Sequence, residues 1–137
     1  MQFLVNLDVD NLEKAVQFYS AAFGLHRGRR LDNSCIEMLG GPAPIYLLEK
    51  AAGTAACNVT ESRRYTRHWT PLHLDLIVEV IEPAVQKAVA AGAVLEEPIS
   101  SHAWGKLALM ADPFGHGFCF VQFSEQGYDA ITAYTEK

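Results

Sequence analysis

Apolar and polar residues alternate along two short segments of the chain, 3–9 and 72–80. The odd positions are apolar in the first segment, and the even positions are apolar in the second. A period of two places successive side chains on opposite faces of a strand, so each segment predicts a strand with one apolar and one mixed face. The mixed faces carry Leu4, Asn6 and Asp8 in the first strand, and His73, Asp75, Ile77 and Glu79 in the second.

Each predicted strand leads directly into a predicted helix. The first helix has Asn11 as its N-cap and Gly24 as its stop, and the second has Pro83 in its first turn and Gly92 just past its end. Each helix has an apolar stripe that is expected to pack against the strands. The stripe consists of Leu12, Ala15, Val16, Tyr19, Ala22 and Phe23 in the first helix, and of Val85, Ala88 and Val89 in the second.

The strand–helix unit is repeated. Segment 5–9 aligns with segment 74–78 at an offset of 69 residues, about half the chain. Three more strand-like stretches follow each helix, and their bounds are 25–31, 34–39, 44–49, 94–100, 104–111 and 117–123. The chain is therefore expected to have an α+β fold of two tandem β-α-β-β-β modules, 1–50 and 72–124. A connector, 51–71, joins the modules, and a tail, 125–137, follows the second module.

These patterns come with three sequence motifs: NLEKAVQFY entering the first helix, HLDLIVEV opening the second module and DPFGHGFCF at its end. Together they resemble the vicinal oxygen chelate superfamily, which includes glyoxalase I, extradiol dioxygenases, fosfomycin-resistance enzymes and bleomycin-binding proteins. The resemblance covers about residues 3–123. It implies one compact domain in which a curled mixed sheet surrounds a cleft, with the helices on the outer faces. Because this fold carries several chemistries, the resemblance does not fix the function.

Enzymes of this superfamily hold a divalent metal with residues from the first and last strands of both modules. Carried over position by position, the resemblance places these ligands at Leu4, Tyr46, His73 and Cys119. Only His73 is a conventional ligand, and Cys119 offers a thiolate at most. A metal that activates substrate needs about three protein ligands. We therefore expect a degenerate site and no cofactor, although a divalent metal stays open.

His73 has three interpretations. It is a hydrogen-bonded residue of the cleft wall, a ligand-contacting donor, or, as a tentative catalytic residue, a general base with a pKa near neutrality. Asp75, two residues along the same face, would hold the tautomer of His73 or form a local ion pair with it. Cys119 is a small buried apolar residue, a nucleophile or a ligand contact.

Aromatic and arginine residues extend the candidate site. Tyr46, Trp69 and Trp104 would suit a planar or hydrophobic ligand, although each is also a candidate core residue. All six arginines fall in two clusters, Arg27, Arg29 and Arg30, then Arg63, Arg64 and Arg67. They are solvated surface charges or a site for a carboxylate or phosphate, and in the second case Arg64 would contact the ligand.

Composition narrows the functional classes. With 11 basic and 16 acidic residues the formal net charge is −5, which argues against nucleic acid as a partner. No apolar run approaches the ~20 residues of a membrane span, and the first residues lack a secretory pattern, so we expect a cytoplasmic protein. Three cysteines cannot pair completely and match no zinc spacing.

The leading hypothesis is a glyoxalase/bleomycin-resistance-like protein, free of metal, that binds a small organic molecule in the cleft between the modules. The alternative is a metal-dependent lyase of the lactoylglutathione-lyase type, in which His73 and Cys119 hold the metal. A third class is an accessory protein whose cleft senses a metabolite. The resemblance and the connector of ~20 residues, which is longer than most loops, also predict a homodimer.

Overall fold

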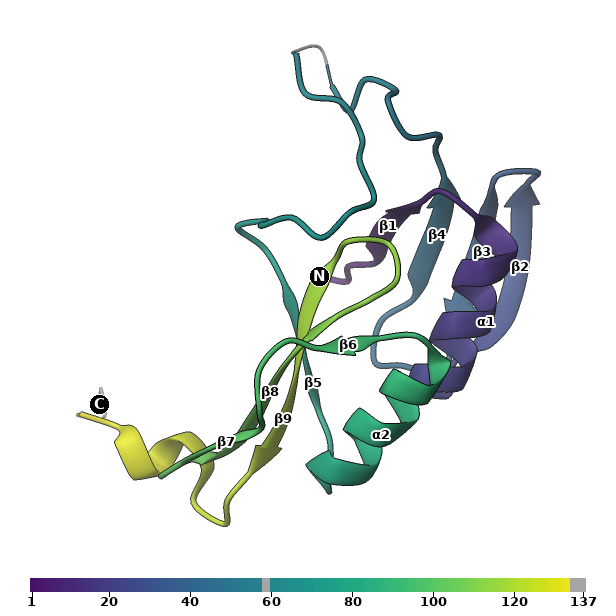
Figure 1. Ribbon diagram of the computed structural model, residues 1–137. Coiled ribbons are helices and arrows are strands. Elements are labelled where there is room, and N and C mark those ends of the chain that lie inside the picture. The colour runs from purple at the N-terminus through teal and green to yellow at the C-terminus, as the bar shows by residue number, and fades with distance from the viewer. Residues whose placement is uncertain (58–59, 134–137) are drawn as a thin grey trace.

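The computed structural model describes residues 1–57 and 60–133. Residues 58–59 of the expected connector and 134–137 of the expected tail lie outside that range. Two modules follow one another along the chain, the first β-α-β-β-β and the second the same with its second strand split in two, which confirms the predicted α+β class (Figure 1). The first module consists of β1 (Val5–Val9), α1 (Leu12–Phe23), β2 (His26–Asp32), β3 (Cys35–Leu39) and β4 (Ile45–Glu49). The second consists of β5 (Leu74–Ile77), α2 (Ile81–Ala91), β6 (Val94–Leu95), β7 (Ser100–His102), β8 (Gly105–Ala111) and β9 (Gly117–Phe123), followed by a 3₁₀ helix, η1 (Gly127–Ile131).

The two modules have the same sheet topology. In the first the strand order is β1-β4-β3-β2, and in the second it is β5-β9-β8 with β6 and β7 both on β8. The first and last strands of each module pair in parallel, with Val5 opposite Ile45 and Leu74 opposite Phe118. The repeat seen in the sequence is thus a repeat of structure. Among the described residues the two sheets remain separate, because β1 does not pair with β5.

The helix ends follow the sequence signals in part. The side chain of Asn11 accepts a hydrogen bond from the Lys14 N–H at 2.9 Å, and Gly24 ends α1 with φ 69°. Val80 provides no side-chain cap for α2. Instead the Ile81 N–H donates to Oε1 of Gln122 on β9 at 2.8 Å. A strand of the same module therefore satisfies the start of the second helix.

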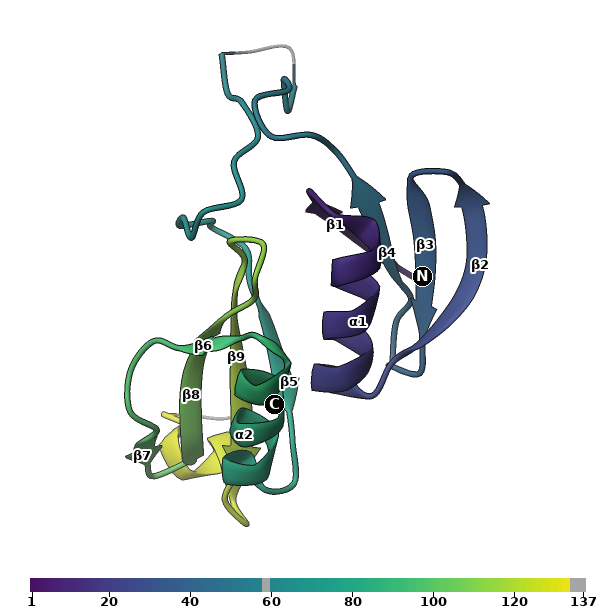
Figure 2. The same cartoon turned by 45° about the vertical axis from the view of Figure 1, so that its right-hand side comes forward.

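One apolar core spans both modules. α1 and α2 pack against each other, and Figures 1 and 2 show them side by side. Phe23 at the end of α1 reaches Phe118 and Phe120 of β9, with ring centroids 5.3 and 6.0 Å apart. Phe18, which was not in the predicted stripe, is buried, whereas Val89 of the predicted second stripe is 45% exposed.

Two predicted strands differ from those observed. The stretch 94–100 is split into β6 and β7, because Pro98 between them has no N–H to give to a neighbouring strand. The stretch 72–80 is shortened to Leu74–Ile77. Phe3 and Leu72, which were expected to pack on the helices, lie before their strands and are 74% and 79% exposed.

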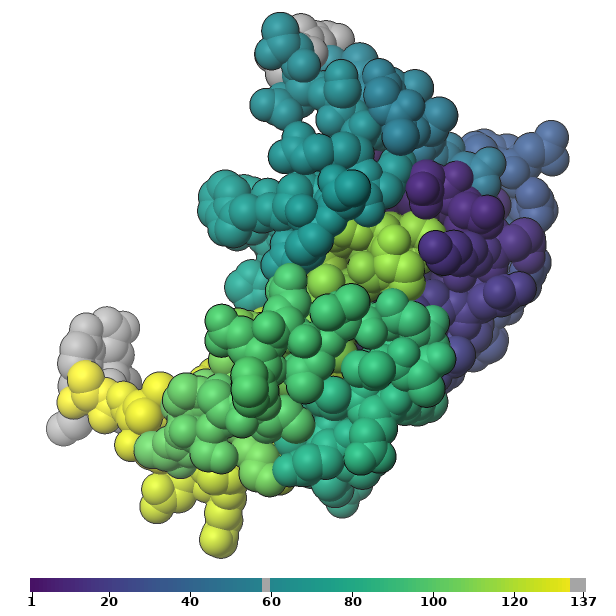
Figure 3. Space-filling model, in the orientation of Figure 1, coloured from purple at the N-terminus to yellow at the C-terminus, as the bar shows by residue number. Residues whose placement is uncertain are grey.

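The connector is attached to both modules by ion pairs. Arg63 contacts Asp8 of β1 at 2.8 Å, and Arg67 contacts Glu96, just after β6, at 2.9 Å. The described part of the connector that comes before Arg63 stands out from the body of the molecule (Figure 3). Within residues 1–57 and 60–133, no helix is both long and apolar enough to cross a membrane.

A buried hydrogen bond joins the modules away from the connector. The hydroxyl of Tyr19 on α1 donates to Oδ2 of Asp112, in the turn between β8 and β9, at 2.5 Å. Both residues are buried, and burial, followed by the nearby carboxylate, raises the pKa of Tyr19 well above its ordinary value. The phenol is therefore a permanent donor at neutral pH.

Removing this donor tests how strongly it holds the modules together. We expect Tyr19→Phe to lower the free energy of unfolding by about 1.5–3 kcal/mol, the usual contribution of a hydrogen bond to a charged group. Urea denaturation measures the change. Tyr128→Phe, at an exposed tyrosine, is the matched control and should stay within about 0.5 kcal/mol of the parent. Equal effects in the two variants would contradict a stabilising role for the Tyr19–Asp112 bond.

Candidate functional site

A cavity of about 600 Å³ lies between the two modules. Its walls come from β1 and β5, from the end of α1 and from the loop 40–43 before β4. The apolar side chains that line it include Val5, Leu7, Phe23, Leu74, Leu76 and Phe118. Of the mixed strand faces expected to form the cleft, Asn6, His73 and Asp75 reach this cavity, whereas Leu4 is not among its lining residues.

The wall is mainly apolar because the sheets do not join. Since β1 and β5 do not pair, the helix-facing side chains at their edges border open space. A cavity between the modules is thus present, but it differs from the predicted cleft, because side chains expected to be covered by the helices form much of its lining.

A smaller hollow of about 170 Å³ lies on the second module. It is lined by Arg67, Trp69, Glu96, Leu109 and Cys119, among others. Thr70, His73, Gly117 and Phe118 line both the small hollow and the large cavity. His73 therefore stands where the two spaces meet.

His73, Asp75 and Cys119 form a cluster whose ligand atoms lie within 4.8 Å of one another. His73 Nε2 is 3.2 Å from Asp75 Oδ1, and Asp75 lies directly opposite Cys119 in the β5–β9 register. The sequence predicted that these three would share a face, and the structure brings them together. Burial, and then the charge of Asp75 and its hydrogen bond, raises the pKa of the Cys119 thiol to about 11. At neutral pH Cys119 is thus a thiol, which is neither a nucleophile nor a ready metal ligand.

This cluster does not fit a resident metal as it stands. Ligands at the usual zinc distances of ~2.0–2.3 Å would be about 3.5 Å from one another, closer than the widest separation in this cluster. The thiol holds its proton, and His73 and Asp75 are exposed and paired with each other. All three donors come from one module, and Leu4 of the other module offers no donor.

Tyr46, the remaining position of the expected metal set, is engaged elsewhere. Its hydroxyl donates to buried Glu37 at 2.7 Å, and Arg29 holds the same carboxylate through Nε at 3.1 Å and Nη2 at 2.7 Å. Hydrogen bonds from Arg29 and then Tyr46 lower the pKa of Glu37 to about 2, and Glu37 in turn raises the pKa of Tyr46. Tyr46 lines neither of the two cavities described above.

The structure separates the other predicted ligand contacts. Trp69 lines the small hollow and is 79% exposed. Trp104 stacks on His102, with ring centroids 4.8 Å apart, and packs beside Tyr128 of η1, so it belongs to an aromatic group outside both cavities. Arg64 is exposed and lies 4.0 Å from Glu61.

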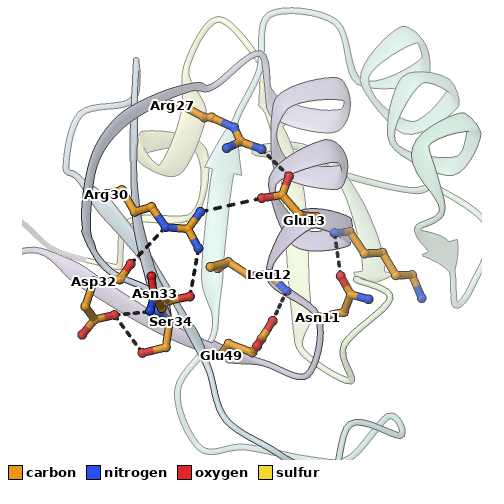
Figure 4. A network of polar contacts seen from close by, with 10 residues as sticks. Asn11, Leu12, Glu13, Arg27, Arg30, Asp32, Asn33, Ser34 and Glu49 are labelled. Atoms are coloured by element: carbon orange, nitrogen blue, oxygen red, sulfur yellow. Dashed lines mark hydrogen bonds and ion pairs between the residues drawn. The ribbon is translucent and has the colours of Figure 1, made fainter.

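The arginine clusters are matched by carboxylates. Arg27 and Arg30 both approach Glu13 on α1, in the network of Figure 4. The pairs formed by the other four arginines are Arg29–Glu37, Arg63–Asp8, Arg64–Glu61 and Arg67–Glu96. Each arginine thus has an acidic partner within the chain, which supports the interpretation of local surface pairing.

Sequence reasoning missed a second polar group at the cavity. Tyr19 and His116 both line it, and both contact the buried carboxylate of Asp112. The sequence assigned Tyr19 to an apolar stripe, and Asp112 entered only as the first residue of the motif DPFGHGFCF. Because one lies on α1 and the other between β8 and β9, their spacing of 93 residues carries no signal of contact.

Comparison with known proteins places this geometry in a family. A family model described as a glyoxalase-like domain matches residues 4–121. No curated protein sequence matches the chain. Hypothetical protein SA1046 from S. aureus is similar in structure, with a TM-score of 0.68 and 21% identity over 89% of this chain and 96% of that one.

Two further solved structures share the fold. The fosfomycin resistance protein FosX from Listeria monocytogenes has a TM-score of 0.68 and 17% identity, covering 92% of this chain and 95% of that one. Lactoylglutathione lyase from Agrobacterium tumefaciens has a TM-score of 0.62 and 16% identity, covering 89% and 92%. At these identities the similarity concerns the fold. Because the family model extends from β1 into β9, the chain belongs to the glyoxalase-like domain family of the vicinal oxygen chelate superfamily.

Proposed function

We propose that this protein binds a small, largely apolar organic molecule in the cavity between its modules, without a resident metal. The cavity carries this proposal. Its volume of about 600 Å³ lies within the range of small-molecule sites, and its lining is mostly apolar with a few polar groups. Such a wall binds by removing apolar surface of the ligand from water.

The charges near the cavity support the same class of ligand. Each arginine has a carboxylate of the chain within 4.0 Å, and none of the described residues lining the cavity is an arginine. An anionic ligand such as a glutathione adduct would therefore find no guanidinium in the described cavity wall. His73 and Asp75 at the edge of the cavity pair with each other. The ligand is therefore expected to gain its affinity mainly from its apolar body.

One observation favours a second candidate, a metal-dependent lyase of the lactoylglutathione-lyase type. His73, Asp75 and Cys119 are three possible ligands within 4.8 Å of one another, one more than the sequence suggested. In that case His73 would bind the metal or act as the base, and Cys119 would have to lose its proton. A third candidate, a metabolite sensor, shares the cavity with the leading proposal and differs only in its downstream partner.

We further propose that two copies of the chain associate. β1 and β5 each pair with one neighbour only, so each leaves an edge unpaired within the described chain. Exposed apolar side chains stand on or beside these edges, namely Phe3, Leu4, Leu72 and Ile77. Edges of this kind invite pairing with another chain, and a second copy is the simplest partner.

Filling the cavity tests the binding proposal. The neutral fluorescent probe N-phenyl-1-naphthylamine should bind the parent protein. Ala43→Trp places a bulky ring at a lining position in the loop before β4 and should weaken that binding about tenfold or more, because the space is occupied. Ala90→Trp, at an exposed site on α2, adds the same side chain outside the cavity and should bind the probe like the parent. Unchanged affinity in Ala43→Trp would exclude the cavity as the binding site.

Elemental analysis tests the metal status. The purified protein should carry no stoichiometric transition metal, and chelator should leave its thermal midpoint unchanged, because Cys119 keeps its proton and Leu4 supplies no ligand. Near one metal per chain, lost in His73→Ala but kept in His26→Ala, would overturn the proposal. That result would make the lyase the leading function, to be checked by a hemithioacetal isomerisation assay.

Solution mass tests the association. Sedimentation or scattering at micromolar concentration should give twice the 15.1 kDa mass of the chain. Ile77→Asp, which puts a charge beside the β5 edge, should shift the protein toward the monomer, whereas Val94→Asp, at an exposed site on β6, should not. A monomeric parent at that concentration would refute the dimer.

A further inference from the structure

We propose that His116 is the polar anchor of the inter-module cavity and that it selects ligands carrying a phenolic hydroxyl. This inference rests on the proposed function, because it names the class of molecule that the cavity would take. It is carried by the hydrogen bonds of Asp112, which fix the direction of the His116 ring and place a proton on its Nδ1.

The Asp112 carboxylate is surrounded by donors. Oδ1 accepts the backbone N–H groups of Phe114 and His116 at 2.8 and 2.9 Å. Oδ2 accepts the Tyr19 hydroxyl at 2.5 Å and lies 2.7 Å from Nδ1 of His116. Asp112 is 5% exposed, so these partners replace water as its surroundings.

This arrangement sets the tautomer of His116. A carboxylate oxygen accepts hydrogen bonds, so Nδ1 carries the proton that points to Asp112. In the neutral ring Nε2 is then the acceptor. Among the described residues no hydrogen bond reaches Nε2, and the His116 side chain is 24% exposed. One ring edge is thus anchored and the opposite edge is open.

The other polar groups at the cavity are largely engaged. The Tyr19 hydroxyl is held by Asp112, the Thr70 hydroxyl donates to the backbone carbonyl of Leu72 at 2.7 Å, and His73 pairs with Asp75. Asn6 on β1 is the exception, an exposed amide at the cavity. His116 Nε2 is the acceptor whose ring is held in place by a buried carboxylate beside the apolar walls. Phe23 and Phe118, which also line the cavity, present aromatic surface next to it.

The ligand chemistry follows from this setting. A hydrogen-bond donor attached to a flat apolar body satisfies Nε2 and covers the aromatic wall, and a phenol combines both features. A ligand carboxylate would be repelled, because it would face the lone pair of His116 Nε2 and the negative charge of Asp112 on the other side of the ring. A ligand with no donor would bury Nε2 without a partner, which carries a desolvation cost. The cavity should therefore prefer an aryl alcohol to its methyl ether.

The test compares 2-naphthol with 2-methoxynaphthalene, which has the same ring system but no donor. Both should displace N-phenyl-1-naphthylamine from the parent protein, with 2-naphthol about tenfold stronger, the usual effect of one hydrogen bond. In His116→Leu this preference should fall to about one, while the affinity for 2-methoxynaphthalene should change little. That retained affinity shows that the variant still forms the cavity.

A second measurement uses the parent protein alone, in case His116→Leu does not fold. The ¹⁵N resonance of His116 Nε2 should shift on addition of 2-naphthol and stay in place with 2-methoxynaphthalene. Equal affinity for the two probes with no shift would overturn the role of His116 but leave the binding cavity intact. Tighter binding of 2-naphthylmethylamine than of 2-naphthol would also overturn it, in favour of a cationic ligand. Binding of no probe would overturn the proposed function as well.

Discussion

The arrangement of the two modules depends on the hydrogen bond from the Tyr19 hydroxyl to the buried carboxylate of Asp112. A carboxylate is costly to bury unless every oxygen has partners, and Asp112 obtains one of its partners from the other module through Tyr19. Two β-α-β-β-β units with separate sheets could otherwise pack at many angles. The requirement to satisfy this one group ties the middle of α1 to the β8–β9 turn. The contact of Phe23 with β9, the orientation of His116 and the cavity between the modules all lie around that connection.

Much of the fold could be predicted because local signals and the repeat agreed. The alternation in 3–9 and 72–80, the cap at Asn11 and the glycines after both helices each located an element within a few residues. The duplication then predicted the order in which these elements occur in two equivalent modules. The prediction failed where a single residue interrupts a pattern, as Pro98 does between β6 and β7. It also failed at the strand ends, since alternation at Phe3 and Leu72 does not show whether a helix extends far enough to cover them.

The site was harder to predict, because its residues meet only in three dimensions. His73, Asp75 and Cys119 could be placed together, since strand register follows from the repeat. Whether the two sheets would join could not be deduced, and that decides which strand faces line the cavity. Tyr46 illustrates the consequence. Its alternation put it on the expected face, but buried Glu37 needed donors, and Tyr46 and Arg29 supply them. Nothing in the sequence indicated that Glu37 would be buried and would need hydrogen-bond donors.

The thiol of Cys119 has a chemical consequence for whatever enters the small hollow. With a pKa of about 11, only about one molecule in ten thousand carries the thiolate at pH 7. Thiolates are the form that attacks electrophiles and peroxides, so this sulfur is slow to alkylate and slow to oxidise. A reactive carbonyl or quinone beside Cys119 would therefore form a covalent adduct slowly, because attack requires the scarce thiolate.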